Sequence, residues 1–454
     1  MNNNEPKIQA DLIICAKWLL TVVPNNQLLQ QYAVVVQGGV IIDIISIANV
    51  FEQYVANEVI TLNDHVLMPG LVNCHTHAAM SLMRGLADDL PLMPWLQDHI
   101  WPAEQAVVSP QFVFDGTLLA CAEMLSGGIT TFNDMYFYPK AAAQACIKAG
   151  MRANLGLLIF DFATAYASDA NAYIKQGLDA RDDLRDEPLL SFSFAPHAPY
   201  TVSDSAFTSV TTLAEQVNIS IHTHVHETLQ EIADSEKAYG LRPISRLANL
   251  GLLGPALTMA HCVHLNAEEI KLLAQHGCSI AHCPSSNLKL ASGIAPIAEY
   301  IKQGINVSLG TDSAASNNRL DMFAEMRLAA LLAKGQSGDA TVVSAFQAIE
   351  MATINGAKAL NMEDKIGSIE VGKLADVVAV NLSEFTMQPI FDVVSHLVYV
   401  AGRESVSHVW VNGDLTYHKP SQSHGVFSNV EPHELAEINS KWVEKLSAFK
   451  RNEG

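Results

Sequence analysis

Eight short apolar segments alternate with helical patterns through the middle of the chain, and this alternation limits the folds open to it. The predicted strands cover residues 71–77, 130–134, 152–157, 190–195, 220–226, 257–261, 278–282 and 306–312. Between them lie segments with helical periodicity, such as 114–125 and 268–275, each followed closely by glycine as a stop signal. Eight strands with intervening helices predict an α/β fold of the (β/α)8, or TIM, barrel type.

The two ends of the chain predict a second, all-β unit. Short β-branched runs with turn residues between them fill residues 8–68, and similar runs return at 373–380 and 406–413. We expect both ends to form one small β-sandwich around the barrel. The predicted parts are 1–68 (sandwich), 69–365 (barrel), 366–425 (sandwich) and 426–454 (C-terminal helix). The helix pattern at 431–449 is amphipathic, which suits packing or a subunit contact, and we expect a homo-oligomer.

Composition excludes several classes of partner. Lys and Arg number 27 against 47 Asp and Glu, a net charge of −20, whereas nucleic acids and anionic membranes require basic patches. The seven cysteines are odd in number and form no Cys-x-x-Cys pair, which favours reduced thiols in a cytoplasmic protein. Residues 1–5 lack the basic start of a signal peptide, and no early segment supplies the about 20 apolar residues of a membrane span. We therefore expect a soluble, cytoplasmic protein.

Two histidines, His75 and His77, stand at the end of the first predicted barrel strand, after a rigid turn predicted at Met68-Pro69-Gly70. Side chains at i and i+2 of a strand point to the same side. Both rings should therefore emerge at the strand's C-terminal mouth, where they could bind one metal ion. The pair alone leaves a purely structural role equally open.

Other predicted strands also end in potential metal ligands. His197, His222, His224, His226, Glu227, His261, His282 and Asp312 all follow or close a predicted strand. In a barrel of this type the catalytic side chains come from the C-terminal ends of several strands. The sequence therefore concentrates its histidines at the predicted mouth of the barrel.

Three imidazoles and a carboxylate suit a borderline divalent ion such as zinc, with one position left for water. Such an ion lowers the pKa of its water to roughly 7, and a general acid/base must then move the proton. Glu227, three residues beyond His224, suits that task. His222 and His226 flank His224 at i−2 and i+2 and compete for the ligand role, which only the His224 to Glu227 spacing decides. His282 could line the pocket or support its ligands.

The combination of His75-Thr-His77, His224-x-x-Glu227, His261 and Asp312 resembles the amidohydrolase superfamily, specifically its metal-dependent aminohydrolase branch, over essentially the whole chain. The resemblance implies that the metal ligands are His75, His77, His224 and Asp312. It implies that Glu227 shuttles a proton to a ring nitrogen, and that His261 and Asp312 orient the attacking water. Relatives with two metals carry a carboxylated lysine at the end of strand four, and residues 192–196 contain no lysine. We expect one divalent ion, zinc before iron, manganese or nickel.

Within this branch, residues 86–96, 101–104 and 195–202 are similar to the methylthioadenosine/S-adenosylhomocysteine deaminases. In those enzymes the residues matching Glu104 and His197 hold the ribose hydroxyls, and the residue matching Trp95 packs on the nucleoside. A carboxylate accepts two neighbouring hydroxyls well. The alternatives are a solvated loop acid for Glu104 and an ordinary core histidine for His197.

The resemblance implies hydrolytic deamination of an adenine nucleoside. Relatives that accept S-adenosylhomocysteine place arginines for its carboxylate in the region matching 155–173, which here contains none. Burying that carboxylate without a cation is costly, and apolar Leu157, Ile159, Phe160 and Phe162 suit a methylthio group. We expect conversion of 5′-methylthioadenosine to 5′-methylthioinosine and ammonia, with adenosine as a lesser substrate, unless Arg152 or a partner subunit supplies the cation.

Other readings of the same residues stay open. The nearest alternative is another hydrolase of this branch: a guanine or 8-oxoguanine deaminase, or a triazine aminohydrolase or chlorohydrolase. Activity on nucleosides and free bases would separate these, because Glu104 and His197 predict dependence on the ribose. A non-catalytic metal-binding scaffold is a more distant alternative, because a scaffold has no need of a proton shuttle such as Glu227.

Overall fold

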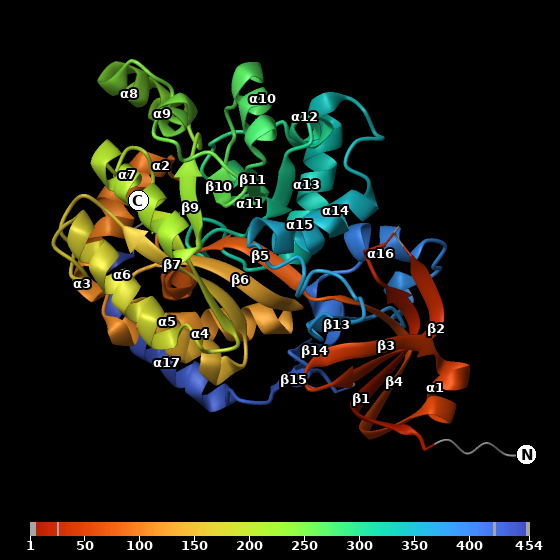
Figure 1. Ribbon diagram of the computed structural model, residues 1–454. Helices are drawn as coiled ribbons and strands as arrows, with labels where there is room; N and C mark the ends of the chain where they lie inside the picture. Colours follow the sequence, from red (N-terminus) through yellow and green to blue (C-terminus); the bar gives the residue numbers. More distant parts are fainter. Residues whose placement is uncertain (1–5, 25–26, 421–423, 451–454) are drawn as a thin grey trace, which may run out of the picture.

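Eight parallel strands form the centre of the larger part of the molecule, and helices cover their outer side (Figure 1). The structure is a computed structural model that describes residues 6–24, 27–420 and 424–450. The strands are β5 (Leu71–Thr76), β6 (Ile129–Tyr136), β7 (Arg152–Ile159), β8 (Leu190–Pro196), β9 (Ser220–Val225), β10 (Leu257–His261), β11 (Ser279–His282) and β12 (Asn306–Leu309), paired in chain order. After β12 the chain returns to β5, since the Asp312 N–H donates to the His75 carbonyl at 2.9 Å. The predicted (β/α)8 barrel is confirmed.

The helices that cover the barrel follow its strands in the chain. They are α4 (Pro110–Ser126), α5 (Pro139–Ala149), α6 (Ala170–Leu184), α7 (Asp204–Val217), α8 (Leu229–Tyr239), α9 (Pro243–Asn249), α10 (Ala267–His276), α11 (Pro284–Lys289), α12 (Ile297–Lys302), α13 (Met322–Ser337), α14 (Ala345–Ala352) and α15 (Ile354–Ala359). Helix α10 shows how the local sequence sets their ends. Its first turn carries a reciprocal cap between Asn266 and Glu269, and Gly277 ends it with a φ of 69°.

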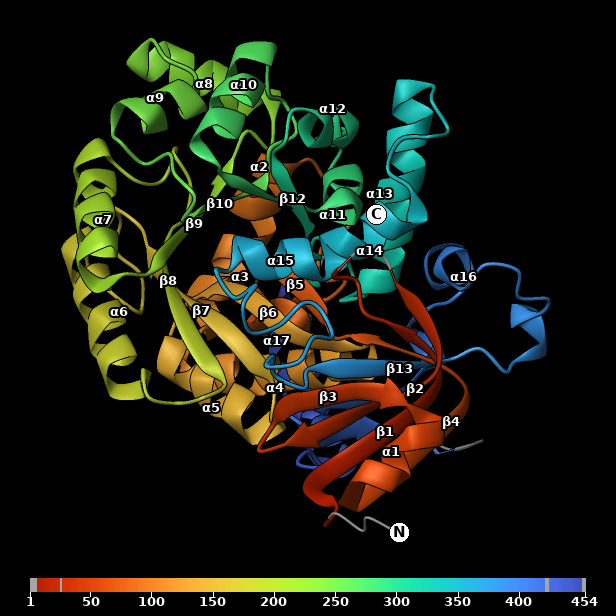
Figure 2. The same ribbon diagram turned by 45° about the vertical axis from the view of Figure 1, so that its right-hand side comes forward.

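The two chain ends form a second, mixed sheet, as predicted (Figure 2). Its order is β16 (Val426–Phe427), β15 (Asp414–His418), β14 (Val406–Val411), β13 (Val377–Asn381), β4 (Tyr54–Pro69), β1 (Ile8–Leu20), β2 (Leu28–Gln37) and β3 (Val40–Ser46). The sheet curls back on itself, because the Ile41 N–H donates to the Lys373 carbonyl at 2.8 Å. Trp410 is fully buried inside this curl. Helix α1 (Ile47–Gln53) covers the other face, and α16 (Val393–Tyr399) follows β13.

The sheet of the chain ends runs directly into the barrel. Strand β4 ends at Pro69 and β5 begins at Leu71, with one residue between them, so the rigid turn predicted at Met68-Pro69-Gly70 is absent. A side chain at Gly70 would place its Cβ only 2.1 Å from Thr130 Oγ1. The glycine therefore serves the close approach of β5 to β6 rather than a turn.

The C-terminal helix α17 (Pro432–Leu446) packs on α4 of the barrel (Figure 1). Trp442 is buried there, with its ring edge-on to Phe112 at 5.0 Å and its indole N–H donating to Asp115 Oδ2 at 2.7 Å. This contact explains the amphipathic pattern at the chain end by packing within the subunit.

A helical segment that follows η1 (Ala78–Met83) lies over one side of the barrel mouth. It consists of α2 (Leu92–Trp95), η2 (Leu96–Ile100) and α3 (Trp101–Val107). Six of its residues line the pocket described below: Leu92, Trp95, Leu96, Ile100, Trp101 and Glu104.

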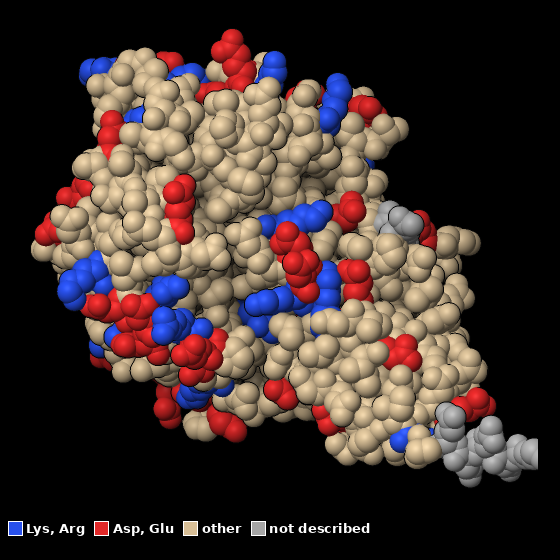
Figure 3. Space-filling model, viewed as in Figure 1, with Lys and Arg blue, Asp and Glu red and all other residues tan. Residues whose placement is uncertain are grey.

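Two sequence expectations concern the outside of the molecule. Within the described ranges, no helix combines the length and the apolar character that a bilayer span requires. The face in Figure 3 carries acidic and basic side chains in mixed groups. Residues 1–5, on which the signal-peptide expectation depends, lie outside the described part of the chain.

Candidate active site

A pocket with an empty volume of about 620 Å³ opens at the C-terminal mouth of the barrel. It is lined by the predicted site residues Trp95, Glu104, His77, His197, His224, Glu227, His261 and Asp312. The remaining predicted residue, His75, is fully buried with its ring packed against those of His77 and His224. The structure therefore brings together all the site residues proposed from the sequence.

The rings of His77 and His224 face each other in a way that calls for a cation. The Nδ1 of His77 lies 2.6 Å from the Met135 carbonyl, and the Nδ1 of His224 lies 2.7 Å from the His197 carbonyl. A carbonyl only accepts, so both Nδ1 atoms carry their ring's proton. Both Nε2 atoms then hold lone pairs, yet they lie 3.3 Å apart. Two lone pairs at that distance repel unless a positive ion lies between them.

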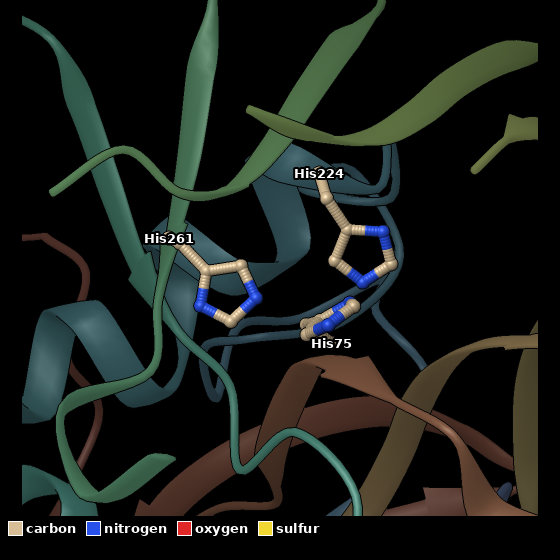
Figure 4. A group of neighbouring side chains, drawn as sticks. All are labelled: His75, His224 and His261. Atoms are coloured by element: carbon tan, nitrogen blue, oxygen red, sulfur yellow. The ribbon is translucent and has the colours of Figure 1, made fainter. Parts of the chain in front are cut away.

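His75 and Asp312 complete the set of potential ligands. Asp312 Oδ1 lies 3.3 Å from the Nε2 of His75 and 3.4 Å from that of His77. The His75 Nε2 is buried without a hydrogen-bond partner among the described residues. Figure 4 shows His75, His224 and His261 turned toward a common space, with ligand atoms within 4.8 Å of one another. His75, His77, His224 and Asp312 thus offer three imidazoles and one carboxylate, a set that fits a zinc-type ion.

The second oxygen of Asp312 is held away from this space. Ser286 and Ser316 donate their hydroxyl protons to Oδ2 at 2.6 and 2.8 Å. Asp312 follows β12 with a φ of 60°, and His261 ends β10 with a φ of 70°. Such strained backbone is typical of functional sites, because it aims side chains that a regular strand would direct elsewhere.

The buried rings stay neutral, as metal binding requires. Burial lowers the pKa of His75 to about 4. Burial and the neighbouring imidazoles hold the pKa of His224 well below its usual range. Burial would raise the pKa of Asp312, but the close contact with His75 and the nearby imidazoles hold it well below its usual value. The site thus offers neutral nitrogen lone pairs and one carboxylate at neutral pH.

Glu227 and His261 form a second pair beside the metal ligands. Their nearest atoms, Oε2 and Nε2, lie 3.7 Å apart, and Ser292 donates to Glu227 Oε1 at 3.1 Å. Burial raises the pKa of Glu227, which makes it a better proton donor near neutral pH. Burial alone would lower the pKa of His261, but the charges of Glu227 and Asp312 outweigh it and raise that pKa.

Two side chains orient this pair. Asn287 Oδ1 accepts from the Nδ1 of His261 at 2.8 Å, which leaves the His261 Nε2 facing Glu227. Glu231, near the start of α8, accepts the backbone N–H groups of His226 and Glu227 at 2.9 and 2.8 Å. The carboxylate of Glu231 therefore fixes the backbone that carries Glu227.

The histidines that competed with His224 have other partners. His222 lies inside the barrel between the Nδ1 of His75, at 3.1 Å, and Asn133, at 2.8 Å. Strand β9 ends at Val225, and His226, with a φ of 56°, turns toward Ile244 and Glu269. Strand alternation therefore places His222 on the inner face but does not extend to His226. His282 is buried at the end of β11 and is absent from the pocket lining.

The proposed ribose-binding residues line the same pocket, and each has one fixed partner. The Tyr136 hydroxyl donates to Glu104 Oε1 at 2.7 Å, and the His197 Nδ1 lies 2.9 Å from Thr201 Oγ1. Burial raises the pKa of Glu104 to about 7, and the bond from Tyr136 opposes this rise. The indole Nε1 of Trp95 is buried without a hydrogen-bond partner among the described residues.

A second cavity, with an empty volume of about 1160 Å³, adjoins the pocket and shares Trp101, Glu104, Phe137 and Phe160 with it. Phe162 and Tyr166 line its far part, and none of its lining residues is Lys or Arg. Of the apolar residues proposed for a methylthio group, Phe160 and Phe162 line the cavities. Leu157 and Ile159 do not, because they alternate along β7 with Leu158, which lines the pocket.

Arg152 is committed elsewhere. It begins β7 at the opposite end of the strand from the mouth, and its guanidinium pairs with Asp376 at 2.7 and 3.0 Å. It is therefore unavailable as a substrate cation within this chain.

Sequence patterns do not identify the supporting residues of the site. Tyr136, Asn287, Ser292 and Glu231 were not singled out by any pattern, and the first three contact partners far away in the chain. Thr201 lies in the stretch 195–202 noted above, but nothing in the pattern gave it a role. Glu231 alone had a local signal, because it stands three residues after the helix cap Thr228.

Comparisons with known proteins bear on the family of this chain. The pattern of the Amidohydrolase family matches residues 66–416. A 5-methylthioadenosine/S-adenosylhomocysteine deaminase of Teredinibacter turnerae is 47% identical over 96% of this chain and 98% of its own length. One of Saccharophagus degradans is 49% identical over 91% of this chain and 92% of its own length.

Solved structures give the same picture of the fold. An adenosine deaminase from Xanthomonas campestris with bound zinc superposes with a TM-score of 0.95 and 44% identity, covering 98% of this chain and 100% of that one. The atrazine chlorohydrolase TrzN from Arthrobacter aurescens, with zinc, reaches a TM-score of 0.84 at 22% identity, over 97% and 100% of the two chains. At that identity the likeness concerns the fold alone.

Proposed function

This chain belongs to the amidohydrolase family, and from that premise we propose that it is a metal-dependent hydrolase that removes the 6-amino group of an adenine nucleoside. The preferred substrate in this proposal is 5′-methylthioadenosine, which yields 5′-methylthioinosine and ammonia. Relatives named as methylthioadenosine/S-adenosylhomocysteine deaminases, at 47% and 49% identity over most of the chain, support the reaction class.

The observation that carries the proposal is the pair of Nε2 lone pairs of His77 and His224, 3.3 Å apart. Both rings have their Nδ1 protons committed to backbone carbonyls. In our proposal one divalent ion is held by His75, His77, His224 and Asp312. Zinc is the first choice, because a related adenosine deaminase structure contains it. The end of β8, Leu190–Pro196, has no lysine that could bridge a second ion.

A bound ion supplies Lewis acidity, which lowers the pKa of a coordinated water to roughly 7. The chain's own residues then handle the proton and the substrate. Glu227, whose pKa burial raises, donates a proton to N1 of the adenine ring and thereby makes C6 electrophilic. His261, fixed by Asn287, orients the attacking water together with Asp312. Glu227 then takes up a proton of the attacking water and passes it to the 6-amino group, which leaves C6 as ammonia. The remaining hydroxyl proton at C6 returns to Glu227 as the carbonyl forms.

The pocket favours a nucleoside over a free base. Glu104 and His197 offer acceptors to the ribose hydroxyls, and Trp95 provides a flat apolar surface for packing on the nucleoside. A free purine or a triazine would leave Glu104 buried without a partner from the substrate, which is costly. This feature separates the proposal from guanine deaminase and triazine hydrolase activities.

The adjoining cavity favours a neutral 5′ substituent. Its lining is largely apolar, with five aromatic residues, and among the described residues that line it only Glu104 is charged. The carboxylate of S-adenosylhomocysteine would be buried there beside Glu104 without a cation, since Arg152 is paired with Asp376. We therefore place 5′-methylthioadenosine above adenosine, and adenosine above S-adenosylhomocysteine.

The test is a steady-state comparison of 5′-methylthioadenosine, adenosine, S-adenosylhomocysteine, adenine and guanine, followed by ammonia release. Metal content is measured on the same sample. We expect the highest kcat/KM for 5′-methylthioadenosine, with about one divalent ion per chain. Faster turnover of guanine or of a triazine would overturn the substrate assignment. Metal binding without turnover of any compound would favour the scaffold alternative.

We also propose that the protein works as a homo-oligomer in the cytoplasm. All seven cysteines are free and buried, which suits a reducing compartment. Light scattering after size-exclusion chromatography measures the oligomeric state directly, and a monomer at micromolar concentration would contradict the first part of this proposal.

A further inference from the structure

We propose that Tyr136 and Thr201 are positioning residues that make the sugar site accept two hydroxyl protons. Each occupies one polar atom of a ribose-binding side chain, so that the other polar atom presents a lone pair to the substrate. This inference rests on the proposed function, in which Glu104 and His197 bind the ribose hydroxyls.

Tyr136 fixes the first acceptor. It is the last residue of β6 and is buried, with its ring edge-on to Phe137. Its single hydroxyl proton points to Glu104 Oε1 at 2.7 Å. No other hydrogen bond reaches the Glu104 carboxylate from the described residues. One oxygen is therefore satisfied within the protein, and the other remains available to a hydroxyl donor in the pocket.

Thr201 fixes the second acceptor, His197, through two successive hydrogen bonds. Its Oγ1 lies 3.2 Å from the Ala198 carbonyl, which can only accept, and in our proposal the hydroxyl proton points there rather than to His197. The same oxygen lies 2.9 Å from the His197 Nδ1 and, with its own proton directed to Ala198, accepts from that nitrogen. A neutral imidazole with its proton on Nδ1 carries a lone pair on Nε2. No described group hydrogen-bonds to this Nε2, which belongs to a pocket-lining ring.

The contacts of Tyr136 and Thr201 both leave a hydrogen-bond acceptor free in the sugar site. Both free atoms accept, and the two neighbouring hydroxyls of a ribose can both donate. Without the Tyr136 hydroxyl, the Glu104 carboxylate loses the contact that sets its rotation, because the last torsion of a glutamate is soft. Without the Thr201 hydroxyl, the His197 proton is free to move to Nε2, which would then repel a donating hydroxyl.

The backbone of His197 links the sugar site to the proposed metal site. Its carbonyl accepts from the Nδ1 of His224 at 2.7 Å, so the sugar site and a proposed metal ligand share one residue. A side chain that holds the ribose in place therefore holds it at a fixed position relative to the reacting C6. We expect the effect of both positioning residues chiefly in the KM of ribosides.

The test compares substrates as well as variants. The variants are Tyr136→Phe, which removes only the hydroxyl, and Thr201→Val, which replaces the hydroxyl by a methyl group and keeps the shape of the side chain. Matched controls are Tyr138→Phe, whose hydroxyl bonds to the Ala165 carbonyl, and Thr212→Val, whose hydroxyl bonds within α7. Metal content is measured for every variant. The substrates are 5′-methylthioadenosine and its 2′-deoxy and 3′-deoxy analogues.

We expect each variant to lose about 10-fold to 100-fold in kcat/KM on the riboside, mostly through KM, with metal content unchanged. On the deoxy analogue that lacks the hydroxyl bound by the affected acceptor, the loss should fall below about 3-fold. The preference for ribose over deoxyribose should therefore collapse in both variants and persist in both controls. Thr201→Ser, which keeps the hydroxyl, should restore the preference.

Two results would overturn the inference and are distinguishable from each other. Equal losses on the riboside and on both deoxy analogues would mean a general structural effect, and the proposed function would stand. If the wild-type enzyme has the same kcat/KM for the riboside, the deoxy analogues and free adenine, Glu104 and His197 do not bind the ribose. This part of the proposed function would then be wrong as well.

Discussion

Arg152 and Asp376 form a buried, doubly hydrogen-bonded ion pair where the barrel meets the sheet of the chain ends. The guanidinium Nε and Nη2 lie 2.7 and 3.0 Å from the two carboxylate oxygens, and the side chains are 5% and 1% exposed. Asp376 Oδ1 also accepts from the Asn412 N–H, and Arg152 Nη1 donates to the Pro188 carbonyl. The pair therefore ties β7 to the approach of β13 and to the turn after β14.

This contact predicts a strong loss of stability when one partner alone is removed. Arg152→Met leaves the Asp376 charge buried, and Asp376→Leu leaves the guanidinium, so each should lower the free energy of unfolding by about 3–5 kcal/mol. The double variant should lose clearly less than the sum, because no buried charge remains. Chemical denaturation of the four proteins measures the coupling. The exposed pair Lys175 and Asp179 serves as control, and its removal should cost under about 1 kcal/mol.

Simple additivity of the two single changes would contradict this account. It would mean that water reaches the pair and compensates each charge separately.

The metal site predicts that binding and catalysis can be separated by variants. His224→Ala removes one Nε2 of the facing pair and should abolish the bound divalent ion and the activity together. Glu227→Gln removes the proton donor but no proposed ligand. It should keep the metal and lower kcat by about 10²-fold to 10⁴-fold. Metal analysis and ammonia release on the same samples test both, with Glu215→Gln on the exposed face of α7 as control.

A Glu227→Gln enzyme that deaminates at the normal rate would disprove the shuttle assignment. Loss of the metal from this variant would instead identify Glu227 as a ligand.

Asn287 predicts an effect on turnover through His261. Its side-chain oxygen fixes the Nδ1 of that ring at 2.8 Å, and both residues are buried. Asn287→Ala should let the ring rotate or change its protonated nitrogen, and we expect a loss of about 10-fold to 100-fold in kcat with little change in KM. Steady-state kinetics with a metal analysis checks this, and Asn249→Ala, at the exposed last residue of α9, is the matched control. A change confined to KM would assign Asn287 to substrate binding.

The strand ends show how far sequence patterns lead. His75, His224, His261 and Asp312 could be placed together because parallel strands deliver their C-terminal residues to one mouth. The same rule failed at His226, where the strand ends one residue earlier and a positive φ redirects the ring. The apolar character of residues 155–173 also misassigned Leu157 and Ile159 to the substrate, since the pocket takes the other face of β7.

The rest of the site depends on contacts that no local pattern encodes. Tyr136 and Glu104 are 32 residues apart, Asn287 and His261 are 26 apart, and Ser292 and Glu227 are 65 apart. Strand β4 lies, apart from Pro69, within the all-β region predicted for residues 8–68. The first half of its 16 residues is mostly exposed, so burial alone does not mark where it begins.

His408 predicts an acid sensitivity that belongs to the sheet of the chain ends. Its ring stacks on Trp410 at 5.5 Å and lies 6.3 and 6.4 Å from those of His65 and His418. Burial, together with the charges of His65 and His418, lowers the pKa of His408 to about 4. In an unfolded chain the ring takes up its proton near pH 6.5. Between these values the unfolded state binds more protons than the folded state.

The free energy of unfolding therefore contains a contribution from His408 that is complete above pH 6.5 and is lost as the pH falls toward 4. His408→Phe keeps an aromatic ring beside Trp410 and removes the titration. Relative to wild type, this variant should become more stable as the pH is lowered from 7 to 5, whatever its stability at pH 8. Thermal midpoints measured at constant ionic strength across that range check the trend, with His276→Phe on the exposed end of α10 as control. A difference between variant and wild type that stays constant with pH would show that the folded ring takes its proton as easily as the unfolded one, and that the three histidines do not act on one another.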